Sequence, residues 1–248
     1  PEKEYRAVLI LRGENLSGDI TDTDPQQLGV EPLNPKALSP QAEKTAHLVQ
    51  EFLKEARQIL SDKHPANMLL LRGFAKRPDW PTMQEAFGLK AAAIASYPMY
   101  RGVAKLVGMQ VLETGSSIQS EFDTLHKHWK DFDFFYVHIK YFDSAGEDGD
   151  FNRKVKIIEE ADGFIPQFLD LQPDVLVVTG DHSTPAKLKS HSWHPVPVIL
   201  WSSSCRADAV KRFDERSCLA GGLGPRLPAV DLMPLALAHA NRLEKFGA

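Results

Sequence analysis

The sequence is poor in cysteine, with Cys205 and Cys218 alone among 248 residues. These two form no CxxC pair and no disulfide framework, so we expect a reduced, cytoplasmic environment. No apolar run approaches the roughly 20 residues of a membrane span, and residues 1–4 carry no apolar stretch typical of a signal peptide. The formal net charge of −4 gives no electrostatic reason to expect nucleic acid as a partner. We therefore expect neither a membrane nor a nucleic-acid partner.

The remaining composition is typical of a folded protein. Hydrophobic residues make up 43% of the chain and charged residues 25%, which excludes disorder as the main state. A chain of this length forms one large domain or two small ones, and buries most of its apolar surface without disulfides.

Apolar segments of strand and helix type alternate along the chain. We expect strands at residues 5–11, 67–71, 89–95, 133–139, 174–179 and 196–201. We expect helices at residues 40–60, 101–107, 122–129, 155–168 (kinked at Pro166) and 229–246, and a loop at 17–40. Residues 174–179, nearly all β-branched and apolar, are typical of a parallel strand covered on both faces. The pattern predicts an α/β protein with a mostly parallel sheet.

Polar residues follow two of the predicted strands. Asp143 and Glu147 come after residues 133–139, and Asp181 and His182 come after residues 174–179, behind a glycine that permits a tight turn. Functional sites of open α/β sheets lie beyond the carboxyl ends of the strands. His191 lies across a loop that can fold back, and the five side chains supply oxygen and nitrogen donors for divalent ions. They suffice for most of a two-metal site, in which ions roughly 3.5–4 Å apart clamp a phosphoryl group.

The spacing also fits purely structural roles. An Asp–His pair behind a strand is more often a capped turn than a metal site, and residues 148–150 are typical of an acidic turn. His138 and His194 have no predicted partner and are interpreted as structural or exposed. The residue pattern alone therefore leaves a metallohydrolase as one hypothesis among these.

A resemblance to a known family begins at residues 179–185, Thr-Gly-Asp-His-Ser-Thr-Pro, and continues through residues 191–198. These segments resemble the archaeal-type, cofactor-independent phosphoglycerate mutases of the alkaline phosphatase-like metalloenzyme superfamily. Supporting matches extend over essentially the whole chain, at residues 5–8, 11–13, 21–25, 71–73, 138–140 and 244–248. The resemblance implies a mostly parallel sheet flanked by helices, with part of an α/β cap at residues 1–81. The C-terminal part of a phosphatase-like, metal-binding core is implied at residues 82–248.

The resemblance also implies an activity, namely the glycolytic isomerisation of 3-phosphoglycerate to 2-phosphoglycerate. In that family a serine takes up the phosphate and returns it to the other hydroxyl, with two divalent ions (Mn, Mg, Zn or Co) neutralising charge. By matching position, Asp181 and His182 are implied as ligands of the ion that activates the nucleophile. Asp143 and His191 are implied as ligands of the other ion.

Two arginines are implied as contacts to the phosphorylated substrate. Arg72 matches an Arg-Gly of the cap, and a guanidinium suits bidentate phosphate binding. Arg101 lies near a family lysine that reaches the phosphate. An ordinary surface cation remains the other interpretation of both, and Arg6 and Arg12 are weaker candidates.

The chain departs from the family pattern in ways that bear on activity. Glu147 stands where the family usually has a histidine, which suits manganese or magnesium better than zinc, or marks a site that no longer works. The nucleophilic serine and the first metal-binding aspartate have no counterpart here, so no catalytic residue is identified. Ser183 lies beside the ligands rather than opposite the metal, and we expect this chain alone to be inactive.

In the family, the serine and the aspartate lie in an N-terminal segment that also supplies central strands of the sheet. Without these strands, edges of the sheet would be left unpaired. Three interpretations follow. The chain is part of a longer mutase, or one product of a split gene with a partner chain. Alternatively it is a noncatalytic metal-binding or assembly protein, covered by repacking or by homo-oligomer formation.

Overall fold

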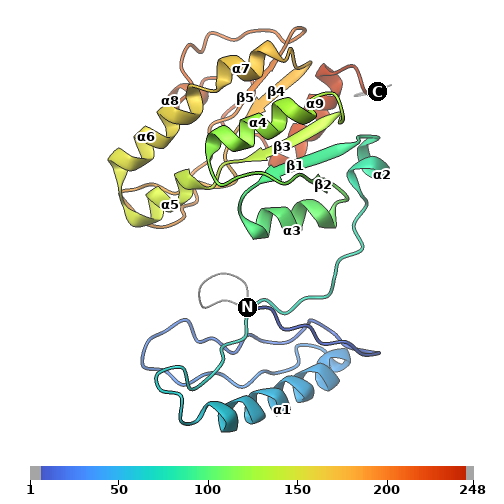
Figure 1. Ribbon diagram of the computed structural model, residues 1–248, viewed down its shortest axis with the longest axis vertical. Coiled ribbons are helices and arrows are strands. Elements are labelled where there is room, and N and C mark those ends of the chain that lie inside the picture. The colour runs from blue at the N-terminus through green and yellow to red at the C-terminus, as the bar shows by residue number, and fades with distance from the viewer. Residues whose placement is uncertain (1–6, 244–248) are drawn as a thin grey trace. The chain divides into compact units, whose positions relative to one another are not determined.

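The computed structural model describes residues 7–243, and the chain divides into two compact units, Pro1–Asp79 and Trp80–Ala248 (Figure 1). The sequence places the boundary between the expected cap and core close by, at residue 81. The roles of the two units as partial cap and metal-binding core stay predictions.

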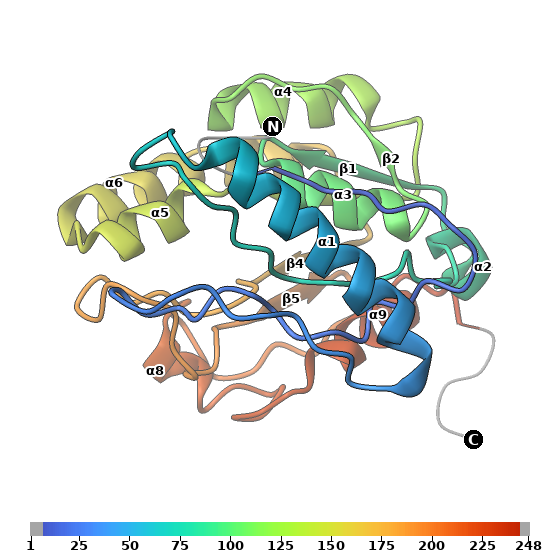
Figure 2. The ribbon, with the colours of Figure 1, turned by 90° about the horizontal axis from the view of Figure 1, so that it is seen from below.

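The first unit is organised around one long helix, α1 (Glu43–Leu60), which follows the short 3₁₀ turn η1 (Pro40–Ala42) (Figures 1 and 2). The helix predicted at residues 40–60 is thus confirmed. Ser39 is extended and Pro40 occupies the first helical position, although the Ser39 hydroxyl makes no capping hydrogen bond. Val49 and Leu53 lie on the buried face of α1 and pack in a small core with Ile20.

The strands expected at residues 5–11 and 67–71 are wrong for the part that the structure describes. Residues 7–11 and 67–71 form no ladder, and Val8 and Ile10 are 70% and 65% exposed; Tyr5 and Arg6 lie outside the described residues. A run of apolar residues favours a half-buried strand. A strand forms, however, only where a neighbouring strand pairs with its backbone hydrogen-bonding groups. Residues 17–39 form a loop, as predicted, with an isolated bridge between Ile20 and Ala37.

The second unit contains a parallel sheet of strand order β2-β1-β3. Its strands are β1 (Ala91–Ala95), β2 (Gln110–Val111) and β3 (Phe134–His138). The helices of the second unit, together with one 3₁₀ turn, are α2 (Met83–Phe87), α3 (Pro98–Leu106), α4 (Ile118–His128), α5 (Tyr141–Asp148), α6 (Phe151–Asp162), α7 (Ile165–Asp170), α8 (Glu215–Cys218), η2 (Ala229–Asp231) and α9 (Leu232–His239). The α/β class with a helix-flanked parallel sheet is confirmed. Ile94 of β1 and Leu125 of α4 are fully buried where the helix covers the sheet.

A second, separate sheet of two strands contradicts the prediction for residues 174–179. β4 (Val175–Val178) pairs with β5 (Ile199–Ser202) in antiparallel register, and is half-buried rather than covered on both faces. A parallel neighbour requires a crossover, usually helical, whereas residues 179–198 contain no helix and return directly. The composition of β4 therefore indicates that the strand has apolar surroundings, but it does not predict whether the neighbouring strand is parallel or antiparallel.

Helix boundaries differ from the prediction in three places. Residues 155–168 belong to two helices, α6 and α7, and Pro166 lies in the first turn of α7, where its missing N–H costs nothing. The helix predicted at 229–246 is η2 followed by α9, which ends at His239; residues 244–246 lie outside the described part. The sequence analysis missed α2, although Thr82 and Glu85 form a capping box that marks its start.

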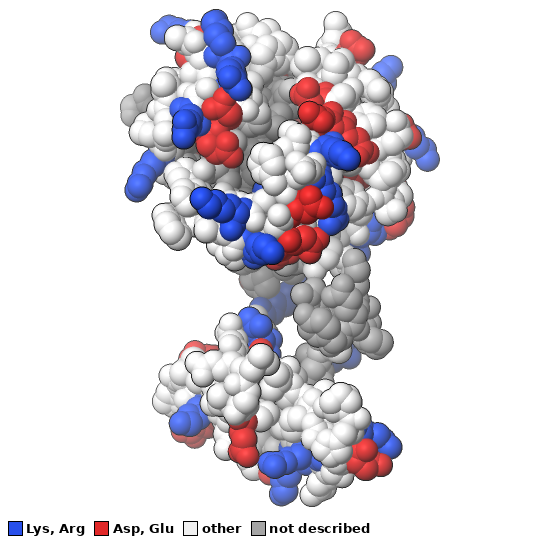
Figure 3. Space-filling view, turned by 90° about the vertical axis from the view of Figure 1, so that its left-hand side faces the viewer, with Lys and Arg blue, Asp and Glu red and all other residues white. Residues whose placement is uncertain are grey.

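The surface carries charges of both signs. The face shown in Figure 3 has Lys and Arg interspersed with Asp and Glu on both units, in line with the small net charge of −4. Within residues 7–243, none of the helices combines the length and the apolar character needed to cross a membrane.

One acidic residue is buried in the second unit. Glu121 of α4 is 0% exposed, and neither carboxylate oxygen has a hydrogen bond of ordinary geometry. Burial raises the pKa of Glu121 to about 7, and Ser96, just past the end of β1, offsets this effect only in part. The fold therefore tolerates the neutral form of this side chain better than the charged form.

We predict that the Glu121→Gln substitution stabilises the chain above neutral pH. Below the unfolded-state pKa of 4.5, Glu121 is protonated in both the folded and the unfolded chain. Between 4.5 and about 7 only the unfolded chain loses the proton, so the wild-type free energy of unfolding falls as pH rises. The fall amounts to about 3 kcal/mol and should be absent in the variant. Urea unfolding at about pH 5 and about pH 8 measures it; the exposed control Glu159→Gln should follow the wild type.

Candidate metal centre

Two loop segments and one helix bring the predicted donors together. α5 follows β3 almost directly and carries Asp143 in its first turn and Glu147 one turn later. Asp181 and His182 follow β4. The loop then folds back through an antiparallel bridge between Ser183 and Ser192, in which the Ser192 amide donates to the Ser183 carbonyl at 2.9 Å. This bridge places His191 beside His182.

The donor atoms converge on Asp143. One donor atom each from Asp143, His182 and His191 lie within 4.8 Å of one another, and the two imidazole rings have centroids 3.9 Å apart. Oδ1 of Asp143 is 3.4 Å from Nε2 of His191 and 3.9 Å from Nδ1 of His182.

The two remaining predicted ligands adjoin this group. Oδ2 of Asp181 lies 3.4 Å from Nε2 of His182, and Oε1 of Glu147 lies 3.6 Å from Nε2 of His191. The structure thus brings all five predicted metal ligands into one cluster. Oxygen and nitrogen donors from carboxylates and imidazoles are the chemistry that divalent ions such as manganese or zinc accept, so the residues present fit such ions.

Asp143 is the most firmly held of the donors, with a side chain only 12% exposed. Lys140 forms an ion pair with Oδ2, and the Thr184 hydroxyl donates to Oδ1 at 2.6 Å. Burial works against ionisation, but these two hydrogen bonds, with the charge of Lys140, outweigh it and lower the pKa of Asp143. The carboxylate is therefore available as an anionic ligand at neutral pH.

Thr184 also determines which nitrogen of His182 is free. Its hydroxyl has a single proton, which it gives to Asp143, so it must accept from Nδ1 of His182 at 3.1 Å. The neutral imidazole then carries its proton on Nδ1 and its lone pair on Nε2, the atom that faces Asp181. A hydrogen bond to one ring nitrogen commonly fixes the other as a metal ligand.

The sequence analysis missed several residues of this cluster. Lys140 and Thr184 lie inside segments that carry the family resemblance, but their chemistry becomes apparent only from their contacts. Tyr100 of α3 donates a hydrogen bond to Asp181 at 2.5 Å and gives no signal in the sequence. Burial opposes ionisation of Asp181, and the Tyr100 hydrogen bond is the largest contribution that lowers its pKa. Burial and the same hydrogen bond raise the pKa of Tyr100.

The two histidines interpreted as lacking a partner both have one. His138, at the end of β3, stacks on Tyr100 with ring centroids 3.5 Å apart, and burial lowers its pKa. Its Nδ1 has no hydrogen-bond partner among the described residues. His194 exchanges a hydrogen bond with Ser192 at 2.9 Å. The His138 partner was missed because Tyr100 lies 38 positions away in the sequence, and the His194 partner because a serine two positions away gives no distinctive signal.

The arginines implied as substrate contacts are engaged in ion pairs. Arg72, in the first unit, is 3.5 Å from Asp24 with its side chain 57% exposed. Arg101 of α3 contacts Glu113 at 2.6 Å and the Ala95 carbonyl, at the end of β1, at 3.4 Å. Their role toward substrate stays a prediction, and Arg6 lies outside the described residues.

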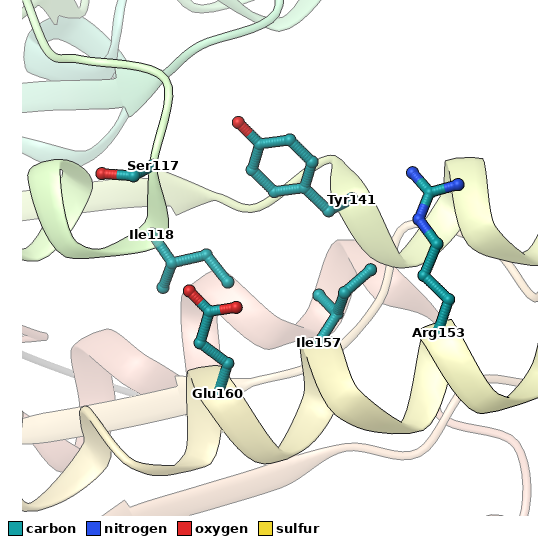
Figure 4. Close-up of a pocket in the computed structure, with 6 residues that line it drawn as sticks. All are labelled: Ser117, Ile118, Tyr141, Arg153, Ile157 and Glu160. Atoms are coloured by element: carbon teal, nitrogen blue, oxygen red, sulfur yellow. The ribbon is translucent and has the colours of Figure 1, made fainter.

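A pocket of about 250 Å³ lies among α4, α5 and α6 and is distinct from the donor cluster (Figure 4). It is lined by Ser117, Ile118, Tyr141, Arg153, Ile157 and Glu160. Arg153 also pairs with Asp148 at 2.7 Å. None of the five predicted metal ligands lines it.

Comparison with known proteins identifies related chains. The sequence model of the Metalloenzyme superfamily matches residues 34–239. A probable 2,3-bisphosphoglycerate-independent phosphoglycerate mutase of Aquifex aeolicus is 53% identical over all of this chain and 62% of that relative. One from Thermus thermophilus is 50% identical over 100% of this chain and 61% of its own length. The chain thus spans less than two thirds of these curated relatives.

Two solved structures are also similar to the chain. The PH0037 protein from Pyrococcus horikoshii has a TM-score of 0.75 and 34% identity, covering 84% of this chain and 60% of its own. The cofactor-independent phosphoglycerate mutase of Thermoplasma acidophilum has a TM-score of 0.65 and 27% identity, covering 92% and 61%. The architecture described above is consistent with the alkaline phosphatase-like metalloenzyme fold.

We predict that Gly146→Ala disrupts the cluster from inside α5. A Cβ at this buried glycine would lie 2.3 Å from the Thr184 carbonyl oxygen, which is backbone and cannot rotate away. Separating α5 from Thr184 should break its bond to Asp143 and destabilise the chain by about 1–3 kcal/mol. The control Gly102→Ala in α3 meets nothing within 4 Å and should stabilise it by about 0.5–1 kcal/mol. Urea unfolding of both variants measures the difference, and equal effects would contradict the packing argument.

Proposed function

The chain belongs to the metalloenzyme superfamily, and on this premise we propose that it supplies the C-terminal part of a metal-dependent phosphoglycerate mutase. The proposed reaction is the conversion of 3-phosphoglycerate to 2-phosphoglycerate, a step of glycolysis. The observation that carries the proposal is the convergence of Asp143, His182 and His191, three residues from two separate strand ends, on one point. The phosphoglycerate mutases among its relatives match this chain over its whole length.

We propose two divalent ions, divided between two pairs of ligands. Asp181 and His182, 3.4 Å apart, would hold the ion next to the nucleophile, and Asp143 and His191, also 3.4 Å apart, the other. Glu147 is within reach of the second pair and adds a carboxylate where the family has a histidine. Carboxylate oxygen favours manganese or magnesium over zinc, and of these two manganese accepts imidazole nitrogen more readily, so manganese is the ion we propose.

Such ions, when bound, neutralise the charge on the attacking and leaving oxygens of a transferred phosphoryl group. The chain's own residues prepare the site for them. Lys140 and Thr184 keep Asp143 ionised, and Thr184 directs the lone pair of His182 toward Asp181. Arg101 is proposed to reach the substrate phosphate, since its partner Glu113 is 86% exposed and can be exchanged for an anion. Arg72 is also proposed to bind the substrate phosphate, since its own side chain is 57% exposed.

The nucleophilic serine and a further metal-binding aspartate are proposed to come from residues outside this chain, in a longer polypeptide or a partner. The free cysteines Cys205 and Cys218 support a reduced, cytoplasmic site of action. The second candidate function is a noncatalytic metal-binding or assembly protein. Glu147 in place of a histidine is the observation that favours it.

Mutase activity tests the first candidate. The chain covers 61–62% of these relatives, and when it is extended by the rest of their length it should convert 3-phosphoglycerate with manganese. Asp143→Asn should lower kcat/KM by about 100-fold or more, because it removes a charged ligand from the centre of the cluster. The matched control Asp148→Asn changes an exposed carboxylate of the same helix, which pairs with Arg153, and should leave kcat/KM unchanged. An inactive extended protein would rule out the mutase.

Metal content separates the two candidates. We expect two manganese ions per chain by elemental analysis after equilibrium dialysis, because the donors form two pairs. His191→Ala should lose one ion and retain the other. His194→Ala, outside the cluster, is the control and should retain both. One ion or none in the wild type would support the noncatalytic alternative instead.

A further inference from the structure

We propose that Tyr100 is a positioning residue, which holds the carboxylate of Asp181 in the orientation required to bind a metal ion. The inference rests on the proposed function, because it assigns a role within the same site. The Tyr100 hydroxyl donates to Oδ2 of Asp181 at 2.5 Å, across 81 positions of sequence. Hydrogen bonds from neutral donors to carboxylates are stronger and shorter than bonds between neutral groups.

Asp181 needs support from outside its own segment. It lies in a loop just past β4, and its side chain is 43% exposed. Within its own segment, Asp181 accepts a bond from the His182 amide to Oδ1 at 3.0 Å, and its Oδ2 lies 3.4 Å from Nε2 of His182. One restrained oxygen still leaves the carboxylate plane free to turn, whereas the bond from Tyr100 to Oδ2 fixes the second oxygen and with it the plane.

The hydrogen bond from Tyr100 leaves Oδ2 of Asp181 able to bind a metal ion as well. Oδ2 of Asp181, the oxygen that accepts from Tyr100, is also the one 3.4 Å from Nε2 of His182. A carboxylate oxygen has two lone-pair directions. Tyr100 occupies one of them, so that the other remains for an ion shared with His182.

Tyr100 is itself immobilised. Its ring stacks on His138 with centroids 3.5 Å apart and an interplanar angle of 25°. It lies in the first turn of α3, which Pro98 begins directly after β1. His138 thus belongs to the parallel sheet and Tyr100 to the helix that follows its strand β1, whereas Asp181 follows β4 of the separate two-stranded sheet. The hydrogen bond from Tyr100 therefore restrains Asp181, which follows one sheet, through a side chain that is packed against the other sheet.

Metal titration tests the inference. Tyr100→Phe removes the hydroxyl and keeps the ring that stacks on His138, so the metal-free variant should still unfold cooperatively, at a urea concentration lowered only by the loss of one hydrogen bond. Titration calorimetry with Mn²⁺ should show the affinity of one of the two ions falling about 10–100-fold, the usual effect of losing a bond that orients a ligand. The visible absorption bands of bound Co²⁺ should shift, which a general loss of stability would not cause.

The matched control is Tyr136→Phe. Tyr136 is a half-buried tyrosine of β3 whose hydroxyl makes no hydrogen bond to any of the five predicted ligands. The Tyr136→Phe variant should bind Mn²⁺ and Co²⁺ as the wild type does. Wild-type affinity and an unshifted Co²⁺ spectrum in Tyr100→Phe would overturn the inference while leaving the proposed function intact, as would equal weakening in both variants. A wild-type chain that binds neither ion would overturn the proposed function and the inference together.

Discussion

The hydrogen bond from Thr184 to Asp143 is the contact on which the rest of the candidate site depends. It joins α5, which follows β3, to the segment that follows β4. The same threonine directs the lone pair of His182, and the same aspartate is the point on which both histidines converge. The buried glycine at position 146 permits this approach, because a side chain there would collide with the Thr184 backbone. One close contact between two strand ends thus fixes the charge of one donor and the tautomer of another.

This dependence follows from how the sheets are built. β1, β2 and β3 form one sheet and β4 and β5 another, and the described residues show no backbone ladder between them. Side chains therefore have to hold the two strand ends in register at the site. Polar contacts from Tyr100 to Asp181 and from Thr184 to Asp143 do so at 2.5 and 2.6 Å. Thr184 contacts both Asp143 and His182, so changing it affects two of the predicted ligands.

The sequence predicts the positions of elements better than their partners. Apolar periodicity located α1, α3, α4 and β3, and the rule that sites lie beyond strand ends selected the donors that cluster. The sequence did not predict the antiparallel pairing of β4 or the absence of strand pairing at residues 7–11. Both depend on whether a neighbouring strand is present and how it runs, which local composition does not encode. Tyr100 was missed for the same reason, since its partner lies 81 positions away. The family resemblance assigned roles to the donors, whereas Lys140 and Thr184 emerged from contacts alone.

The charge of the cluster explains why Glu147 is compatible with metal binding. Asp143, Asp181 and Glu147 bring three negative charges, of which Lys140 neutralises one through its ion pair with Asp143. Two divalent cations would carry four positive charges, so the Glu147 carboxylate would strengthen their attraction to the cluster and favour ions that prefer oxygen. Glu147 and Asp143 both face His191, at 3.6 and 3.4 Å, so an ion held there would share three donors.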